Sequence, residues 1–120
     1  RAARTILNAS YSEPSEGLFK QLRWMPIRAR IDYKRARIDY KRATFVYKAL
    51  NGLAPPYCRD LFQFVKDKHT RNTRSARNDK LYIDPKYKKG HIQKSIAVIG
   101  SKIWNTLDST ITGASSLSLF

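Results

Sequence analysis

The chain has 120 residues, and its 24 Lys and Arg against 9 Asp and Glu give a net charge of +15. With 42% hydrophobic residues it is too apolar for a disordered tail and long enough for one modest core. No apolar run reaches 18 residues and no secretory segment is present, so nothing suggests membrane insertion or secretion and no membrane partner is expected. Cys58 is the single cysteine, so an internal disulfide is impossible and a reducing intracellular compartment, nucleus or cytoplasm, is expected.

The first 25 residues predict two short helices separated by a linker. Residues 1–9 are typical of a helix interior, because no capping residue precedes them. Residues 10–17 are rich in turn-forming residues, and residues 18–25 again have a helical pattern. The other end stops at Phe120, just as an apolar periodic segment begins. We therefore expect a single C-terminal fragment of a larger protein.

A long helix is predicted from about residue 26 to residue 50. Pro26 suits the first position of a helix, and Asn51-Gly52 is a typical stop signal. Residues 28–34 (Arg-Ala-Arg-Ile-Asp-Tyr-Lys) are repeated identically as 35–41, and residues 42–48 keep four of the seven. A strand is the alternative, but the alternation changes phase between repeats and would flip every side chain of one continuous strand. We favour a helix with a local duplication.

As a helix, the repeat separates its side chains by type. Ala and Tyr form one stripe, and Ile31, Ile38 and Phe45 lie on the opposite side. Ion pairs are expected at i,i+4 between Arg28 and Asp32 and between Arg35 and Asp39. The tyrosines at 33 and 40 are candidates for stacking on bases, whereas the one at 47 is expected in the core.

The second half predicts shorter elements around an irregular basic region. In chain order we expect a short helix over 57–65, a loop over 66–80, a short strand over 81–83, a basic turn over 86–90, a core helix over 95–107 and a Ser/Thr-rich tail over 108–120. The expected fold class is mainly α: a small helical domain with one long helix (about 26–50), shorter helices and an irregular basic loop region, with at most one short strand pair. Its parts are 1–9, 18–65, 66–94, 95–107 and 108–120.

Two segments carry most of the positive charge, and both are candidates for phosphate binding. Residues 20–48 hold ten Lys and Arg against two Asp, and residues 66–94 hold ten against three Asp. Concentrated charge of this kind can follow a phosphate backbone, although a solvated loop explains the second segment equally well. The candidate nucleic-acid-binding residues are Arg28, Arg30, Lys34, Arg35, Arg37, Lys41, Arg71, Arg74 and Arg77.

Residues that could form a catalytic centre are missing. Cys58, His69 and His91 lack metal-ligand spacing, and the sequence has neither a Gly-rich phosphate loop nor an Asp-Asp pair for two-metal chemistry. We therefore expect no catalytic residue, no metal site and no cofactor. Cys58, Trp24 and Trp104 lie in apolar periodic segments and are expected in the core.

Five ordered blocks resemble the C-terminal tail of LINE-type (non-LTR) retrotransposon reverse transcriptases. They are residues 1–7 (Arg-Ala-Ala-Arg-Thr-Ile-Leu), 22–31 (Leu-Arg-Trp-Met-Pro-Ile-Arg-Ala-Arg-Ile), 46–57 (Val-Tyr-Lys-Ala-Leu-Asn-Gly-Leu-Ala-Pro-Pro-Tyr), 70–76 (Thr-Arg-Asn-Thr-Arg-Ser-Ala) and 97–107 (Ala-Val-Ile-Gly-Ser-Lys-Ile-Trp-Asn-Thr-Leu). The chain departs from the family pattern in its duplicated heptad, in Ile96 where an aromatic is usual, and in Asp108 where Pro is expected.

The resemblance implies a region downstream of the polymerase palm of an RNA-directed DNA polymerase. Such a tail is not an enzyme by itself, and it is expected to help bind template RNA or target DNA through phosphate contacts, next to the rest of the parent polymerase. Two alternatives remain open at this point. Residues 27–50 could be a helix that binds a protein partner, or the chain could be a decayed genomic remnant without a selected function.

Overall fold

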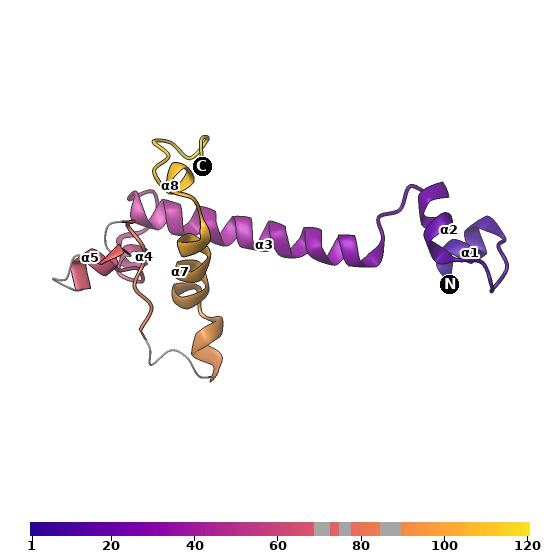
Figure 1. Ribbon diagram of the computed structural model, residues 1–120, viewed down its shortest axis with the longest axis horizontal. Helices are drawn as coiled ribbons and strands as arrows, with labels where there is room; N and C mark the ends of the chain where they lie inside the picture. The colour runs from indigo at the N-terminus through magenta and orange to yellow at the C-terminus, as the bar shows by residue number, and fades with distance from the viewer. Residues whose placement is uncertain (69–72, 75–77, 85–89) are drawn as a thin grey trace. The chain divides into compact units, whose positions relative to one another are not determined.

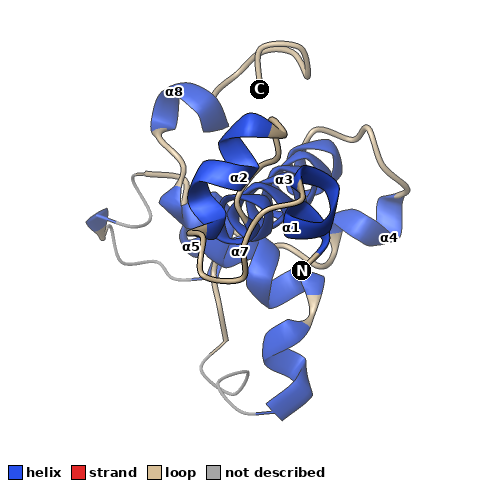
Figure 2. Cartoon of the chain, turned by 90° about the vertical axis from the view of Figure 1, so that its right-hand side faces the viewer, coloured by secondary structure: helices blue, strands red, loops and turns tan. Residues whose placement is uncertain are grey.

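The computed structural model describes residues 1–68, 73–74, 78–84 and 90–120 (Figure 1). The chain divides into two compact units, Arg1–Arg37 (unit 1) and Ile38–Phe120 (unit 2). The described part consists of helices and loops (Figure 2). Its only β pairing is an isolated antiparallel bridge between Phe64 and Leu81. The mainly helical fold class with one long helix is confirmed.

Unit 1 begins with two short helices, α1 (Ala2–Leu7) and α2 (Ser15–Gln21), which pack against each other. Ala3 of α1 and Leu18 of α2 are its buried side chains. α1 ends at Asn8, which has a left-handed φ of 51°, a conformation that Asn tolerates better than most residues. The helix expected within 1–9 is present, whereas the second helix covers residues 15–21 and so begins in the expected linker and ends before residue 25.

The long helix α3 (Ile27–Leu50) has 24 residues, some of which belong to each unit. It starts one residue later than expected, because Pro26 supplies the carbonyl that accepts the first bond, from the Arg30 amide (2.9 Å). It ends as predicted: Gly52 takes a left-handed φ of 71°, and the Leu53 amide donates back to the Lys48 carbonyl (2.8 Å). The helical interpretation of the repeat is confirmed. None of the helices in the described part combines the length and hydropathy needed to cross a membrane.

The core of unit 2 forms between the C-terminal end of α3, the helix α7 (Ile96–Thr106) and the short helix α4 (Pro56–Arg59). Its buried side chains are Val46, Tyr47, Ala49, Cys58, Phe62, Leu81 and Trp104. The predictions that Tyr47, Cys58 and Trp104 are core residues are therefore confirmed. Phe120 also packs here. The centroid of its ring lies 4.6 Å from that of the Tyr47 ring and 6.0 Å from that of the Trp104 ring.

The short elements of unit 2 differ from the expectations. The helix expected over 57–65 is reduced to α4, and a one-turn helix α5 (Val65–Lys68) occupies the start of the expected loop. The strand expected over 81–83 is only a bridge, because α5 begins at Val65, directly after the paired Phe64. A 3-10 helix η2 (Gly90–Lys94) precedes α7, and residues 85–89 of the expected basic turn lie outside the described part.

The C-terminal tail contains one further turn of helix, α8 (Ser109–Thr112). Its N-cap is Asp108, whose carboxylate accepts a hydrogen bond from the Ser109 amide (2.7 Å). Sequence reasoning missed this element because the Ser/Thr-rich composition outweighed the capping signal of Asp108. The tail then returns to the core through Ala114, whose carbonyl accepts the Tyr47 hydroxyl (2.8 Å).

Candidate nucleic-acid interface

Four cations follow one line along α3. Arg30, Lys34, Arg37 and Lys41 are spaced by four, three and four residues, and all four are exposed. At 3.6 residues per turn this spacing places them within roughly 60° around the helix axis. We call these four residues the α3 stripe.

The α3 stripe has no carboxylate within it. Asp32 and Asp39, the two acidic residues of the helix, lie on the far side of its axis. Tyr33 and Tyr40 border the stripe on one side, with 58% and 61% of their surfaces exposed. Like charges at i,i+4 repel each other and weaken a helix, so this arrangement favours a bound polyanion.

Arg28 and Arg35 were predicted with the same patch, but the helix separates them from it. They lie roughly 130–150° around the axis from the stripe, on the side of Asp32 and Asp39. The ion pairs expected there are also wrong: Asp39 pairs with Arg42 at i,i+3 (3.0 Å), and the described residues include no ion pair between Arg28 and Asp32. The six predicted cations of α3 therefore form a group of four and a group of two.

The structure describes only part of the second basic segment, residues 66–94. Arg74 is described and exposed, whereas Arg71 and Arg77 lie outside the described residues. Two neighbouring cations are already engaged. Lys66, which is exposed, donates to Asp79 (2.6 Å), and this hydrogen bond raises the pKa of Lys66, outweighing the opposite effect of desolvation. Lys80 donates to the Asn105 carbonyl (3.2 Å).

Unit 1 contains a pocket that sequence reasoning missed. Its volume is about 680 Å³, and residues of α1, α2 and the start of α3 line it. Leu18, Phe19, Trp24, Met25 and Ile27 supply apolar surface, and four arginines line it as well, Arg1, Arg4, Arg23 and Arg30. None of the residues that line the pocket, all of them described, is acidic.

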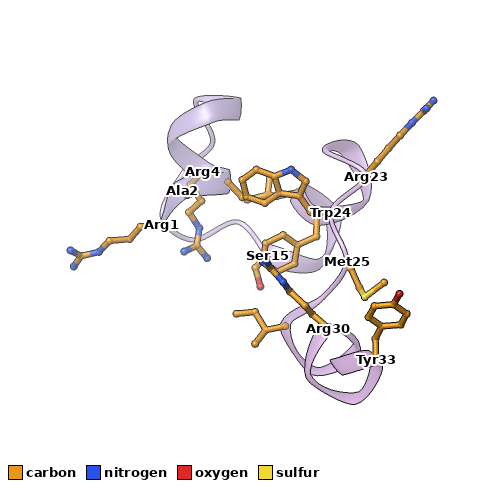
Figure 3. Close-up of a pocket in the computed structure, with 13 residues that line it drawn as sticks. Arg1, Ala2, Arg4, Ser15, Arg23, Trp24, Met25, Arg30 and Tyr33 are labelled. Atoms are coloured by element: carbon orange, nitrogen blue, oxygen red, sulfur yellow. The ribbon is translucent and has the colours of Figure 1, made fainter. Parts of the chain in front are cut away.

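The placement of Trp24 corrects the expectation that it is a core residue. It is 43% exposed, and its ring stacks on that of Phe19 with 6.4 Å between centroids. It lies outside a helix because Arg23 takes a left-handed φ of 53° just after α2. Figure 3 shows the Trp24 indole in the middle of the pocket, with Arg1 and Arg23 extending outward. The available signal was that Trp24 and Met25 directly precede Pro26, where the short helical pattern of residues 18–25 has to end.

The described residues contain no group of three His, Cys, Asp or Glu side chains placed to hold a metal ion. The candidate surfaces are the α3 stripe and the unit 1 pocket. No protein-family model matches the chain, and no curated protein or solved structure matches it either.

Proposed function

We propose that this chain is the post-palm, C-terminal region of a LINE-type retrotransposon RNA-directed DNA polymerase. Its role is to bind RNA or DNA by phosphate contacts, inside the nucleus or cytoplasm, without catalysing a reaction itself. The resemblance over five ordered blocks supports the family. The α3 stripe, an exposed line of four cations free of carboxylates, supports the binding role most directly.

The dimensions of the α3 stripe suit a nucleic-acid backbone. Arg30 and Lys41 are eleven residues apart, which is about 16 Å along a helix that rises 1.5 Å per residue. That length matches the rise of about five nucleotides of one strand in a duplex. The duplicated heptad contributes Arg37 and Lys41, so the duplication doubles the number of cations in the line.

The test compares two pairs of arginines that are matched by the repeat itself. Arg30 and Arg37 occupy the third position of each heptad and belong to the stripe. Arg28 and Arg35 occupy the first position and do not. The variants R30Q/R37Q and R28Q/R35Q have the same composition and net charge. We expect R30Q/R37Q to weaken RNA and DNA binding and to reduce the slope of log K against log salt by about two.

The variant R28Q/R35Q is expected to keep nearly the whole slope, because its arginines lie beside Asp32 and Asp39. The measurement is fluorescence anisotropy with labelled 20-nucleotide RNA and DNA between 50 and 200 mM salt, a range chosen on the order of that over which phosphate contacts are lost. Equal slopes for the two variants would show that the stripe is not the interface. No binding of the unaltered chain at 50 mM salt would refute the binding role itself.

A protein-binding role for α3 is the second candidate, and one observation favours it. Ile27, Ile31 and Ile38 are exposed along one side of the helix, where an apolar partner could cover them. Binding of this kind persists at about 0.5 M salt, because it does not depend on charge. Self-association measured by sedimentation at that salt, lost in I31Q/I38Q and retained in R30Q/R37Q, would support this candidate over the first.

A further inference from the structure

The unit 1 pocket leaves more apolar surface exposed than a small helical unit needs to. Trp24, Met25 and Ile27 all line it, and each is exposed. Its volume of about 680 Å³ lies within the range of pockets that hold small ligands or parts of larger ones. Clustered apolar surface of this kind marks a binding site more often than a scattered exposed side chain does.

The chemistry of the lining restricts the occupant. Phe19 and Trp24 offer a stacked aromatic pair, and Trp24 is the more exposed of the two. The charged residues that line the pocket are all arginines. An occupant with a negative charge is therefore favoured, and a positively charged one is disfavoured. In Figure 3 the Arg30 side chain reaches from α3 toward Ser15, while the Arg23 side chain extends outward at the edge of the pocket. A flat apolar body flanked by anionic groups fits both features.

We infer that this pocket takes an unpaired base of a single-stranded nucleic acid, stacked on Trp24, with the phosphates next to that base meeting Arg23 and Arg30. The inference rests on the proposed function, because it adds a base site for the strand that the α3 stripe would bind. In a duplex each base is paired and stacked on its neighbours and cannot enter. The pocket therefore gives the chain a preference for single strands without base-specific hydrogen bonds.

The experiment uses the full chain with Trp104→Phe, which leaves Trp24 as its only tryptophan. Three 12-nucleotide probes are titrated at the same salt concentration: a single-stranded thymidine oligomer, an abasic oligomer with the same phosphates, and a duplex. We expect the thymidine oligomer to quench Trp24 fluorescence and to bind about tenfold more tightly than the abasic oligomer, as stacking of one base predicts. The duplex is expected to bind without quenching.

A second pair of variants keeps the inference testable if Trp104→Phe disturbs the core. Trp24→Leu removes the stacking ring but retains an apolar side chain, and Tyr57→Leu is the matched control, an exposed aromatic in unit 2. Anisotropy should show the tenfold preference for bases lost in Trp24→Leu and retained in Tyr57→Leu.

The outcomes separate the two proposals. Equal affinity for the thymidine and abasic oligomers, without quenching, would overturn the base pocket and leave the α3 stripe standing. A change of Trp24 fluorescence with protein concentration alone would show that a second copy covers the pocket, and would also overturn it. No binding of any probe at 50 mM salt, the low end of the range over which phosphate contacts persist, would refute the proposed function and this inference together.

Discussion

The side-chain amide of Asn105 forms hydrogen bonds with both backbone groups of Leu81, its amide and its carbonyl. The Leu81 amide donates to Asn105 Oδ1 (2.8 Å), and Asn105 Nδ2 donates to the Leu81 carbonyl (2.9 Å). Leu81 is buried, and it is also the residue that bridges to Phe64. A side chain of α7 thus takes the place that a neighbouring strand would have in a sheet, which explains how a single bridge persists without one.

Asn105→Ala should destabilise unit 2 because it leaves an amide and a carbonyl of a buried residue without partners. Each unsatisfied group costs about 1–3 kcal/mol, so for the two groups we expect a loss of about 2–6 kcal/mol in the free energy of unfolding, measured with urea. The control is Thr106→Ala, which removes an exposed hydroxyl that bonds only within its own helix. Thr106→Ala should change the free energy by less than about 0.5 kcal/mol, and an equal effect of both would contradict the role of Asn105.

Gly100→Ala tests how closely α7 packs on α3. A Cβ atom at this position would lie 2.8 Å from Val46 Cγ2 and 3.3 Å from Phe62 Cε1, and both of those side chains are buried. Neither can move freely, so we expect destabilisation by about 1–3 kcal/mol in thermal or urea unfolding. Gly17→Ala is the matched control in α2, where a Cβ meets nothing within 4 Å. It should cause no loss of stability, since Ala favours a helix over Gly.

The same heptad position provides a comparison between Tyr47 and Tyr40. Tyr47 is 2% exposed and donates its hydroxyl to the Ala114 carbonyl, whereas Tyr40 is 61% exposed. Tyr47→Phe should cost about 1 kcal/mol for the lost hydrogen bond, and Tyr47→Ala about 3–5 kcal/mol for the lost packing. Tyr40→Ala should change the free energy of unfolding by less than about 0.5 kcal/mol. If Tyr40→Ala lowered the free energy of unfolding as much as Tyr47→Ala, Tyr40 would have to be packed against another part of the protein.

Deletion of residues 35–41 separates stability from binding. Every side chain of this heptad is exposed, so the free energy of unfolding of unit 2 should change by less than about 0.5 kcal/mol. The deletion removes Arg37 and Lys41 and rotates the remaining helix by only about 20°. The salt slope of nucleic-acid binding should therefore fall by about two, as in R30Q/R37Q. A stable deletion variant that binds with an unchanged slope would contradict the role of the α3 stripe.

Local signals in the sequence were enough to predict the helices and one part of the candidate site. Pro26 and the Asn51-Gly52 pair define the limits of α3 to within a residue, and the apolar period of 95–107 predicts α7. These elements depend on neighbours a few residues away, which a sequence displays directly. The helical period also implies that Arg30 and Arg37 fall on a different line from Arg28 and Arg35, although the composition alone grouped all four together.

What surrounds each element was decided only by tertiary packing. Tyr40 and Tyr47 have the same heptad position, and Trp24 and Trp104 lie in similar apolar segments, yet only Tyr47 and Trp104 are buried. The contacts that bury Tyr47 come from Ala114 and Phe120, more than sixty residues further along the chain. A periodic pattern shows which side of a helix could be buried. Whether that side is buried depends on a distant segment returning to cover it, and no local pattern contains that information.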